Sequence, residues 1–202
     1  MGKRKNDSLG RRTGTRKYNP VCWISSEGQT EKDYFALDAI RKHSRFSVKH
    51  PQDIHPDRRN PRAVLKRFQK ALRNEDFRAI DEAWIVVDVD EWDSDELGSL
   101  FTWASQDNRC HVAISNPKFE LYLVMHFEKG NGCTTAPKVD AAIRRRMPGY
   151  DKRLKPGQFS EDQIRMAMEN ARAKRRGHRE DIPAPGMTDV YQLVESLIGG
   201  NE

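Results

Sequence analysis

Residues 81–96 read DEAWIVVDVDEWDSDE, and they carry the strongest indication of fold class in the chain. Its first half contains a five-residue apolar run, Ala83–Val87, with acidic residues on both sides. A short run of β-branched and aromatic residues predicts a strand that is buried on both faces, which is typical of a parallel sheet. From Asp88 to Glu96 the composition reverses, because six of these nine residues are carboxylates. We therefore expect a central strand that ends in an acidic loop.

The acidic loop predicts a cation site. Clustered carboxylates raise one another's pKa values unless cations stabilise their charge. Asp88 and Asp90 are two positions apart, so an extended chain directs both side chains to one side. In open parallel sheets the ligand lies beyond the carboxyl ends of the strands, and hard cations such as Mg²⁺ take oxygen ligands. The acids of residues 93–96 have another explanation, because they fit the first turn of a helix that Ser94 caps.

Composition limits the class of protein. The chain has 202 residues and a mass of 23.4 kDa, which suits one domain of ordinary size. No apolar run approaches the roughly 20 residues of a membrane-spanning helix, and residues 1–20 lack the apolar segment of a signal peptide. The cysteines, Cys22, Cys110 and Cys133, are scattered without CxxC spacing. These features predict a cytoplasmic protein with no membrane segment, disulfide or zinc site.

The charge of the chain points to a polyanionic partner. The chain contains 36 Lys and Arg against 30 Asp and Glu, which gives a net charge of +6 and a pI near 9.3. Nucleic acid is the commonest partner of such basic proteins. Residues 1–17 contain seven Lys or Arg and little apolar content, which predicts a disordered basic tail. This tail and the basic residues of 144–179 either attract phosphates or are simply solvated.

Alternating strand and helix patterns predict an α/β fold: a Rossmann-like, mostly parallel sheet flanked by helices. The chain divides into a disordered tail over 1–19, an α/β core over 20–128, and a basic helical extension over 129–202 that packs back on the core. Thr30 and Asp33 predict a capping box for the first helix. The expected strands are 21–24, 45–50, 83–87 and 110–114, and the expected helices are 30–43, from Pro61, from Ser94, 117–127, a short helix ending at 144–146, 160–176 and 188–198.

Glu27 lies in the turn after the first expected strand, as Asp88 follows the central strand. The carboxyl ends of parallel strands meet at the same edge of a sheet. If the two strands are neighbours, we therefore expect the carboxylates of Glu27, Asp88 and Asp90 to converge there.

Three segments together resemble the RloB-like, or AbiLii-like, family of phage-defence proteins, which belongs to the wider Toprim-like group. The resemblance covers about residues 20–198 and implies a Toprim-like fold. The segments are 26–31 (SEGQTE), 84–90 (WIVVDVD) and 115–123 (SNPKFELYL), and the closing stretch 188–194 (TDVYQLV) also resembles the family.

Toprim domains place a Glu after the first strand and a DxD pair after a later strand, and these acids bind Mg²⁺ for chemistry on phosphodiesters. The resemblance implies that Glu27 corresponds to that Glu, and that Asp88 and Asp90 correspond to the pair. These three residues would be catalytic and would bind Mg²⁺ or Mn²⁺. Trp92 stands where many Toprim proteins have a third acid, so a second metal site would need a substitute ligand.

Lys118 and Glu120 belong to the SNPKFELYL segment, whose start we expect at the carboxyl end of a strand. Lys118 could neutralise charge that develops at a phosphate, and Glu120 could be a further ligand, so both are candidate catalytic residues. In the alternative interpretation Asn116 caps the helix and Glu120 offsets the helix dipole. We expect His126, farther along the same helix, to be structural.

The leading hypothesis is a metal-dependent nuclease that cuts DNA, RNA or tRNA as an effector in antiphage defence by abortive infection. The resemblance implies an AAA-type or ABC-type ATPase partner, and the chain has no Walker A loop of its own. The alternative is a non-catalytic nucleic-acid-binding or ATPase-docking subunit. A haloacid-dehalogenase-like phosphotransferase is disfavoured, because its DxD would follow the first strand. Trp92 and Trp103, which we expect to be exposed, would permit a homodimer interface.

Overall fold

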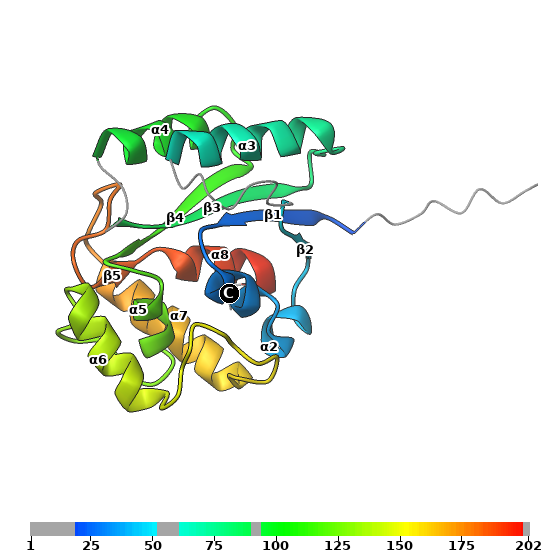
Figure 1. Cartoon of the computed structure of the whole chain (residues 1–202). Coiled ribbons are helices and arrows are strands. Elements are labelled where there is room, and N and C mark those ends of the chain that lie inside the picture. The colour runs from blue at the N-terminus through cyan, green and yellow to red at the C-terminus, as the bar shows by residue number, and fades with distance from the viewer. Residues whose placement is uncertain (1–18, 52–60, 90–93, 200–202) are drawn as a thin grey trace, which may run out of the picture.

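The computed structural model describes residues 19–51, 61–89 and 94–199. Five strands form one sheet in the order β2-β1-β3-β4-β5 (Figure 1). Strands β2, β1, β3 and β4 are parallel, and β5 is antiparallel to β4. The predicted α/β class and mostly parallel sheet are confirmed. The strands are β1 (Val21–Ser26), β2 (Ser47–Lys49), β3 (Glu82–Asp88), β4 (Cys110–Asn116) and β5 (Met187–Thr188).

Helices cover both faces of the sheet. In Figure 1, α3 and α4 lie above it, and the remaining helices lie below it. No helix in the described part of the chain is long and apolar enough to cross a membrane. The helices are α1 (Gln29–Phe35), α2 (Asp38–Arg41), α3 (Pro61–Asn74), α4 (Ser94–Ala104), α5 (Glu120–Val124), α6 (Ala136–Arg146), α7 (Glu161–Arg175) and α8 (Val190–Ile198).

The apolar core has two layers, one on each side of the sheet, and β3 contributes to both. Side chains alternate between the faces of a strand. Ala83, Ile85 and Val87 therefore pack in the cluster under α3 and α4, whereas Trp84 and Val86 join the larger cluster on the other face. This arrangement confirms the prediction of a strand that is buried on both sides.

The first predicted helix differs from the structure. It is broken between α1 and α2, and Gly28 rather than Thr30 is the N-cap residue. The predicted capping box is wrong because both side chains bind a distant loop instead. Thr30 Oγ1 donates to the Lys152 carbonyl over 2.8 Å, and Asp33 Oδ2 accepts from the Leu154 N–H over 3.1 Å.

The helix predicted from residue 117 begins later, because Asn116 belongs to β4 and a cis peptide bond joins it to Pro117. The side-chain amide of Asn116 donates to the Pro183 carbonyl over 2.8 Å, so it does not cap a helix. The helix is α5, which begins at Glu120. The last predicted helix also starts two residues late, because Met187 and Thr188 pair with β4 as strand β5.

The part of the chain after residue 128 contributes β5, α6, α7 and α8. Its buried apolar residues belong to the same cluster as those of β1, α1 and α5. The predicted basic tail falls almost entirely on residues 1–18, which lie outside the described residues.

Candidate functional site

The carboxyl ends of β1 and β3 form the topological switch point of the sheet. The chain passes from β1 to β2 on one side, and then crosses back to place β3 and β4 on the other side. In open α/β sheets, ligands bind at such a point, because the loops that leave the two central strands diverge. The site is therefore built from the residues that directly follow β1, β3 and β4.

Glu27 and Asp88 lie at the ends of these two neighbouring strands. The pairing places Ser26 opposite Val86, so Glu27 leaves β1 at the level where β3 reaches its own last residues. Glu27 is exposed, and Asp88, the last residue of β3, is half-buried. Asp90, the third predicted metal ligand, lies outside the described residues.

A hard cation would suit this edge of the sheet, because Glu27 and Asp88 supply carboxylate oxygens from adjacent strands. Within residues 19–51, 61–89 and 94–199, no group of three or more His, Cys, Asp and Glu side chains is arranged to hold a metal ion. A three-carboxylate site would therefore need a ligand from outside these ranges, and Asp90 is the predicted one. The Mg²⁺ or Mn²⁺ site therefore stays a prediction.

Lys118 and Glu120 lie beside this edge, because they follow β4, the neighbour of β3. The Lys118 ammonium lies 2.7 Å from Asp140 Oδ1 in α6 and 3.8 Å from Glu120 Oε2. The side chains of Lys118 and Glu120 are only 13% and 10% exposed. Lys118 thus holds two carboxylates together, and Glu120 is buried rather than solvated at a helix end.

Glu31 is a further buried carboxylate that the sequence analysis did not single out. It is the third residue of α1 and is 6% exposed. A Cβ at Gly28 would lie 2.6 Å from Glu31 Oε2, so the carboxylate folds back over the start of its own helix. Burial raises the pKa of Glu31 to about 7, and the charge of Glu120 adds to the rise. Its only sequence signal was its place at the end of SEGQTE.

Tyr150 joins these elements into one polar network. Its hydroxyl lies 2.9 Å from Thr30 Oγ1 in α1 and donates to Glu120 Oε1 in α5 over 3.4 Å. Burial raises the pKa of Tyr150 well above its usual value, so the hydroxyl stays protonated. The loop that carries Tyr150 therefore connects α1 and α5 beside the switch point.

We expect Glu31→Gln to stabilise the protein near pH 8. Because the folded pKa of about 7 exceeds the ordinary value of 4.5, the stability that this group contributes is fully present below pH 4.5 and is lost as the pH rises through 7. Gln keeps a hydrogen-bond acceptor and removes the ionisation. The expected gain in unfolding free energy is about 1–3 kcal/mol near pH 8 and about zero near pH 4. Urea unfolding at both pH values measures it, with the exposed Glu75→Gln as control; a loss of stability near pH 8 would contradict the assignment.

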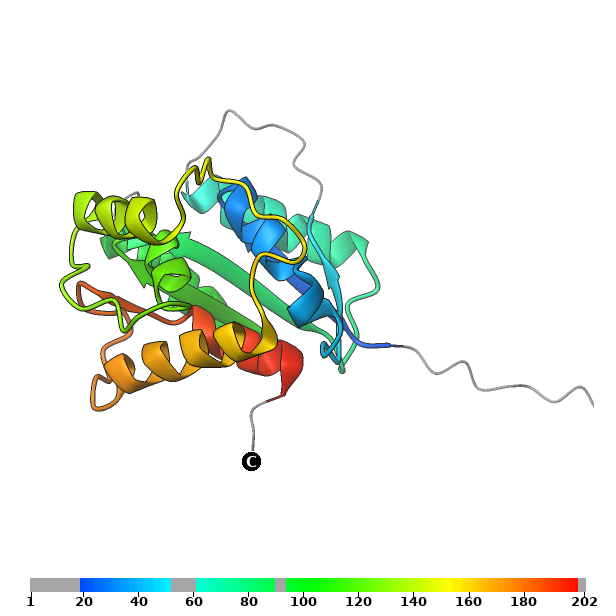
Figure 2. The same cartoon turned by 90° about the horizontal axis from the view of Figure 1, so that it is seen from below.

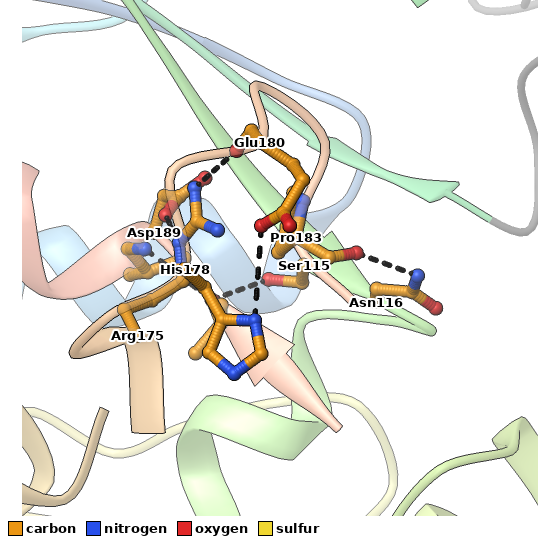
Figure 3. Close-up of polar contacts among 9 residues, drawn as sticks. Ser115, Asn116, Arg175, His178, Glu180, Pro183 and Asp189 are labelled. Carbon is orange, nitrogen blue, oxygen red and sulfur yellow. Dashed lines mark hydrogen bonds and ion pairs between the residues drawn. The ribbon is translucent and has the colours of Figure 1, made fainter. Parts of the chain in front are cut away.

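Figure 3 shows the hydrogen bonds and ion pairs that hold the segment between α7 and β5 beside the end of β4. Asn116 Nδ2 donates to the Pro183 carbonyl over 2.8 Å. Arg175 Nε donates to Asp189 Oδ1 over 2.7 Å, and its guanidinium also donates to the Glu180 carbonyl over 2.9 Å. These contacts hold the segment at the same edge of the sheet as the candidate site.

The basic run 174–179 divides into inward and outward residues. Lys174 donates to the carbonyls of Gly130 and Gly186, and Arg175 pairs with Asp189. These two cations therefore hold the fold together. Arg176 and Arg179 are exposed. The two interpretations of this run, phosphate attraction or simple solvation, therefore concern only its exposed residues.

Two aromatic predictions have different outcomes. His126 is 1% exposed and lies 3.0 Å from the Tyr34 hydroxyl, which supports its structural role. The expectation that Trp103 is exposed is wrong: it is 6% exposed, because it packs against Phe68 with 5.7 Å between ring centroids. Trp92 lies outside the described residues.

No curated protein and no solved structure matches the chain. The family model described as RloB-like protein matches residues 22–197. This span contains both switch-point carboxylates, Glu27 and Asp88, as well as Lys118, Glu120 and the network around Tyr150. The match covers most of the chain, from β1 to the last turn of α8, and the chain belongs to the RloB-like protein family.

Proposed function

We propose that this protein is a metal-dependent nuclease that acts as an effector in antiphage defence. The observation that carries the proposal is the position of Glu27 and Asp88 at the carboxyl ends of neighbouring parallel strands, at the switch point of the sheet. The resemblance to Toprim-like proteins supports the same pair of positions for phosphodiester chemistry. The resemblance to RloB-like proteins implies an AAA-type or ABC-type ATPase partner, and this supports such a partner for this chain.

Glu27, Asp88 and Asp90 would hold Mg²⁺ or Mn²⁺. The chemistry that such an ion supplies when bound is activation of water and stabilisation of negative charge at the phosphate. The ion pairs of Lys118 with Asp140 and Glu120 favour a positioning role for Lys118 over direct contact with phosphate. Through Glu120 and Tyr150, Lys118 would keep α5, α6 and α1 in place around the reacting group.

The proposal is tested by incubating the purified full chain with plasmid, single-stranded DNA, total RNA and tRNA in Mg²⁺ or Mn²⁺. We expect at least one substrate to be cut, and cleavage to stop in chelator and in Asp88→Asn. Substrates that are cut name the class of nucleic acid. Cleavage that persists in chelator or in Asp88→Asn would contradict the proposed site, and intact substrates under every condition would reject the nuclease for the isolated chain.

A non-catalytic nucleic-acid-binding or ATPase-docking subunit is the second candidate. The observation in its favour is the set of exposed basic residues after residue 128, among them Arg144, Arg176 and Arg179. This candidate predicts binding of nucleic acid or of the ATPase without cleavage, and binding that Asp88→Asn leaves unchanged. Metal-dependent cutting by the wild type would exclude it.

A further inference from the structure

Lys152 has an unusual backbone conformation. Among the residues that the structure describes, it alone combines a side chain with a positive φ, at 65°. This left-handed conformation is unfavourable for residues with a Cβ, because the Cβ crowds the neighbouring carbonyl oxygen. Gly149, three residues earlier, has a φ of 80° without that penalty. Strained positions of this kind cluster at functional sites, where the surrounding structure maintains the strain because the side chain has a function there.

The loop around Lys152 is fixed along α1. We call residues 148–156 the strap; Figure 2 shows it in yellow beside α1 and α2 in blue. Thr30 Oγ1 donates to the Lys152 carbonyl over 2.8 Å. Asp33 Oδ2 accepts from Arg153 Nε over 2.7 Å and from the Leu154 N–H over 3.1 Å. At its far end, the Pro156 carbonyl accepts from the Asp38 N–H over 2.9 Å. The strained conformation is therefore held from both sides.

None of these contacts uses the Lys152 ammonium. The side chain is exposed, and with the rest of the described chain its ammonium forms neither a hydrogen bond nor an ion pair. The positive charge of Lys152 also acts on Glu31: it lowers the pKa of that carboxyl and so opposes the rise that burial causes. Glu31 lies in the first turn of α1, four residues after Glu27, and Thr30 of the same turn binds the Lys152 carbonyl. Lys152 is therefore a cation near the switch-point edge. Arg153, by contrast, is already paired with Asp33.

We propose that the strap binds a phosphate group of the nucleic-acid chain, with the Lys152 ammonium as the phosphate-binding group. This inference rests on the proposed function in assigning nucleic acid to the site. A fixed strap holds the Lys152 backbone in place before binding, so the loop itself loses little conformational entropy when phosphate arrives. A lysine acts on phosphate as a point charge, so this contact positions the substrate without reading its sequence.

Lys152→Gly separates the side chain from the backbone, because glycine adopts the same φ freely. The probe is a fluorescein-labelled single-stranded oligonucleotide, as DNA and as RNA, mixed with the full chain in chelator. At low salt we expect Lys152→Gly to bind roughly three- to tenfold more weakly than wild type. The slope of log Kd against log salt should fall by roughly 0.7. The melting temperature should be unchanged or higher.

Lys152→Arg, which keeps the charge, should bind like the wild type. Lys155→Gly, which removes another exposed lysine of the strap, should bind more tightly than Lys152→Gly. Equal affinity of Lys152→Gly and wild type, or no binding by wild type, would overturn the inference. So would a Lys152→Gly protein that melts well below wild type, because Lys152 would then be a structural countercharge for Glu31.

The two proposals can fail separately, because the binding assay needs no cleavage. A wild type that binds through Lys152 and cuts no substrate would reject the nuclease and retain the phosphate contact. A wild type that cuts, with Lys152→Gly equal to it in binding, would reject only the phosphate contact.

Discussion

Glu27→Gln is expected to lower the rate of metal-dependent cleavage by at least about 10³-fold, while the melting temperature stays that of the wild type. Loss of one carboxylate removes a ligand and a negative charge from the site, and a rise of about 4 kcal/mol in the activation barrier corresponds to this factor. Folding should be little affected, because Glu27 is an exposed residue in the turn after β1. Single-turnover cleavage with saturating enzyme measures the chemical step directly.

Glu75→Gln is the matched control, because Glu75 is also exposed and follows α3, away from the switch point. It should cut at the wild-type rate. Raising the concentration of Mn²⁺ should recover part of the activity of Glu27→Gln if the lost oxygen is a metal ligand. A Glu27→Gln protein that cuts as fast as the control would remove Glu27 from the site.

His126→Ala is expected to have the largest effect on stability. The His126 ring stacks on Phe159 with 4.0 Å between centroids, and its Nδ1–H donates to the Tyr122 carbonyl over 3.0 Å, so Nε2 accepts from the Tyr34 hydroxyl. Alanine leaves a cavity in this cluster and a buried hydroxyl without its partner. We expect a loss of about 3–5 kcal/mol in unfolding free energy and a fall of about 10 °C in melting temperature.

The pH dependence of the same residue gives an independent test. Burial lowers the pKa of His126 from 6.5 to about 3, so the unfolded chain binds a proton where the folded protein does not. The contribution of His126 to the free energy of unfolding is therefore complete above pH 6.5 and is lost as the pH falls toward 3. His126→Phe, which keeps a ring against Phe159, should lose this component of the acid sensitivity. The exposed His178→Ala serves as control, and an unchanged acid sensitivity in His126→Phe would contradict the buried neutral imidazole.

Much of the α/β architecture was predictable because local composition specifies it. Ala83–Val87 is apolar without interruption, so it had to be buried on both faces, and β3 lies between two helical layers. The apolar period of 3.6 residues predicted the main helices. Glu27 and Asp88 were identified because each is an acidic residue at the end of a predicted strand. The capping of α7 by Ser160, which accepts from the Gln163 N–H, is similarly local.

Predictions failed where a side chain had two possible partners. Thr30, Asp33 and Asn116 are residues that cap helices, and each instead binds a segment more than 60 residues away. Capping and tertiary hydrogen bonds satisfy the same polar atoms, so only the packed structure decides between them. Strand β5 was not predicted, because a strand of two residues is too short to show an alternating apolar pattern. It is defined only by its pairing with β4 in the folded protein.

The α/β class, the burial of β3 and the acids that follow or end two strands could be predicted from the amino-acid sequence, because they depend on apolar period and on residue chemistry. That β1 and β3 are neighbours, and hence that Glu27 and Asp88 share one edge, became known only from the folded arrangement. The same holds for the meeting of Glu31, Glu120 and Tyr150, and for the strap that holds Lys152 beside them. Contacts between residues 30 to 122 positions apart depend on strand order and helix packing, which no local pattern encodes.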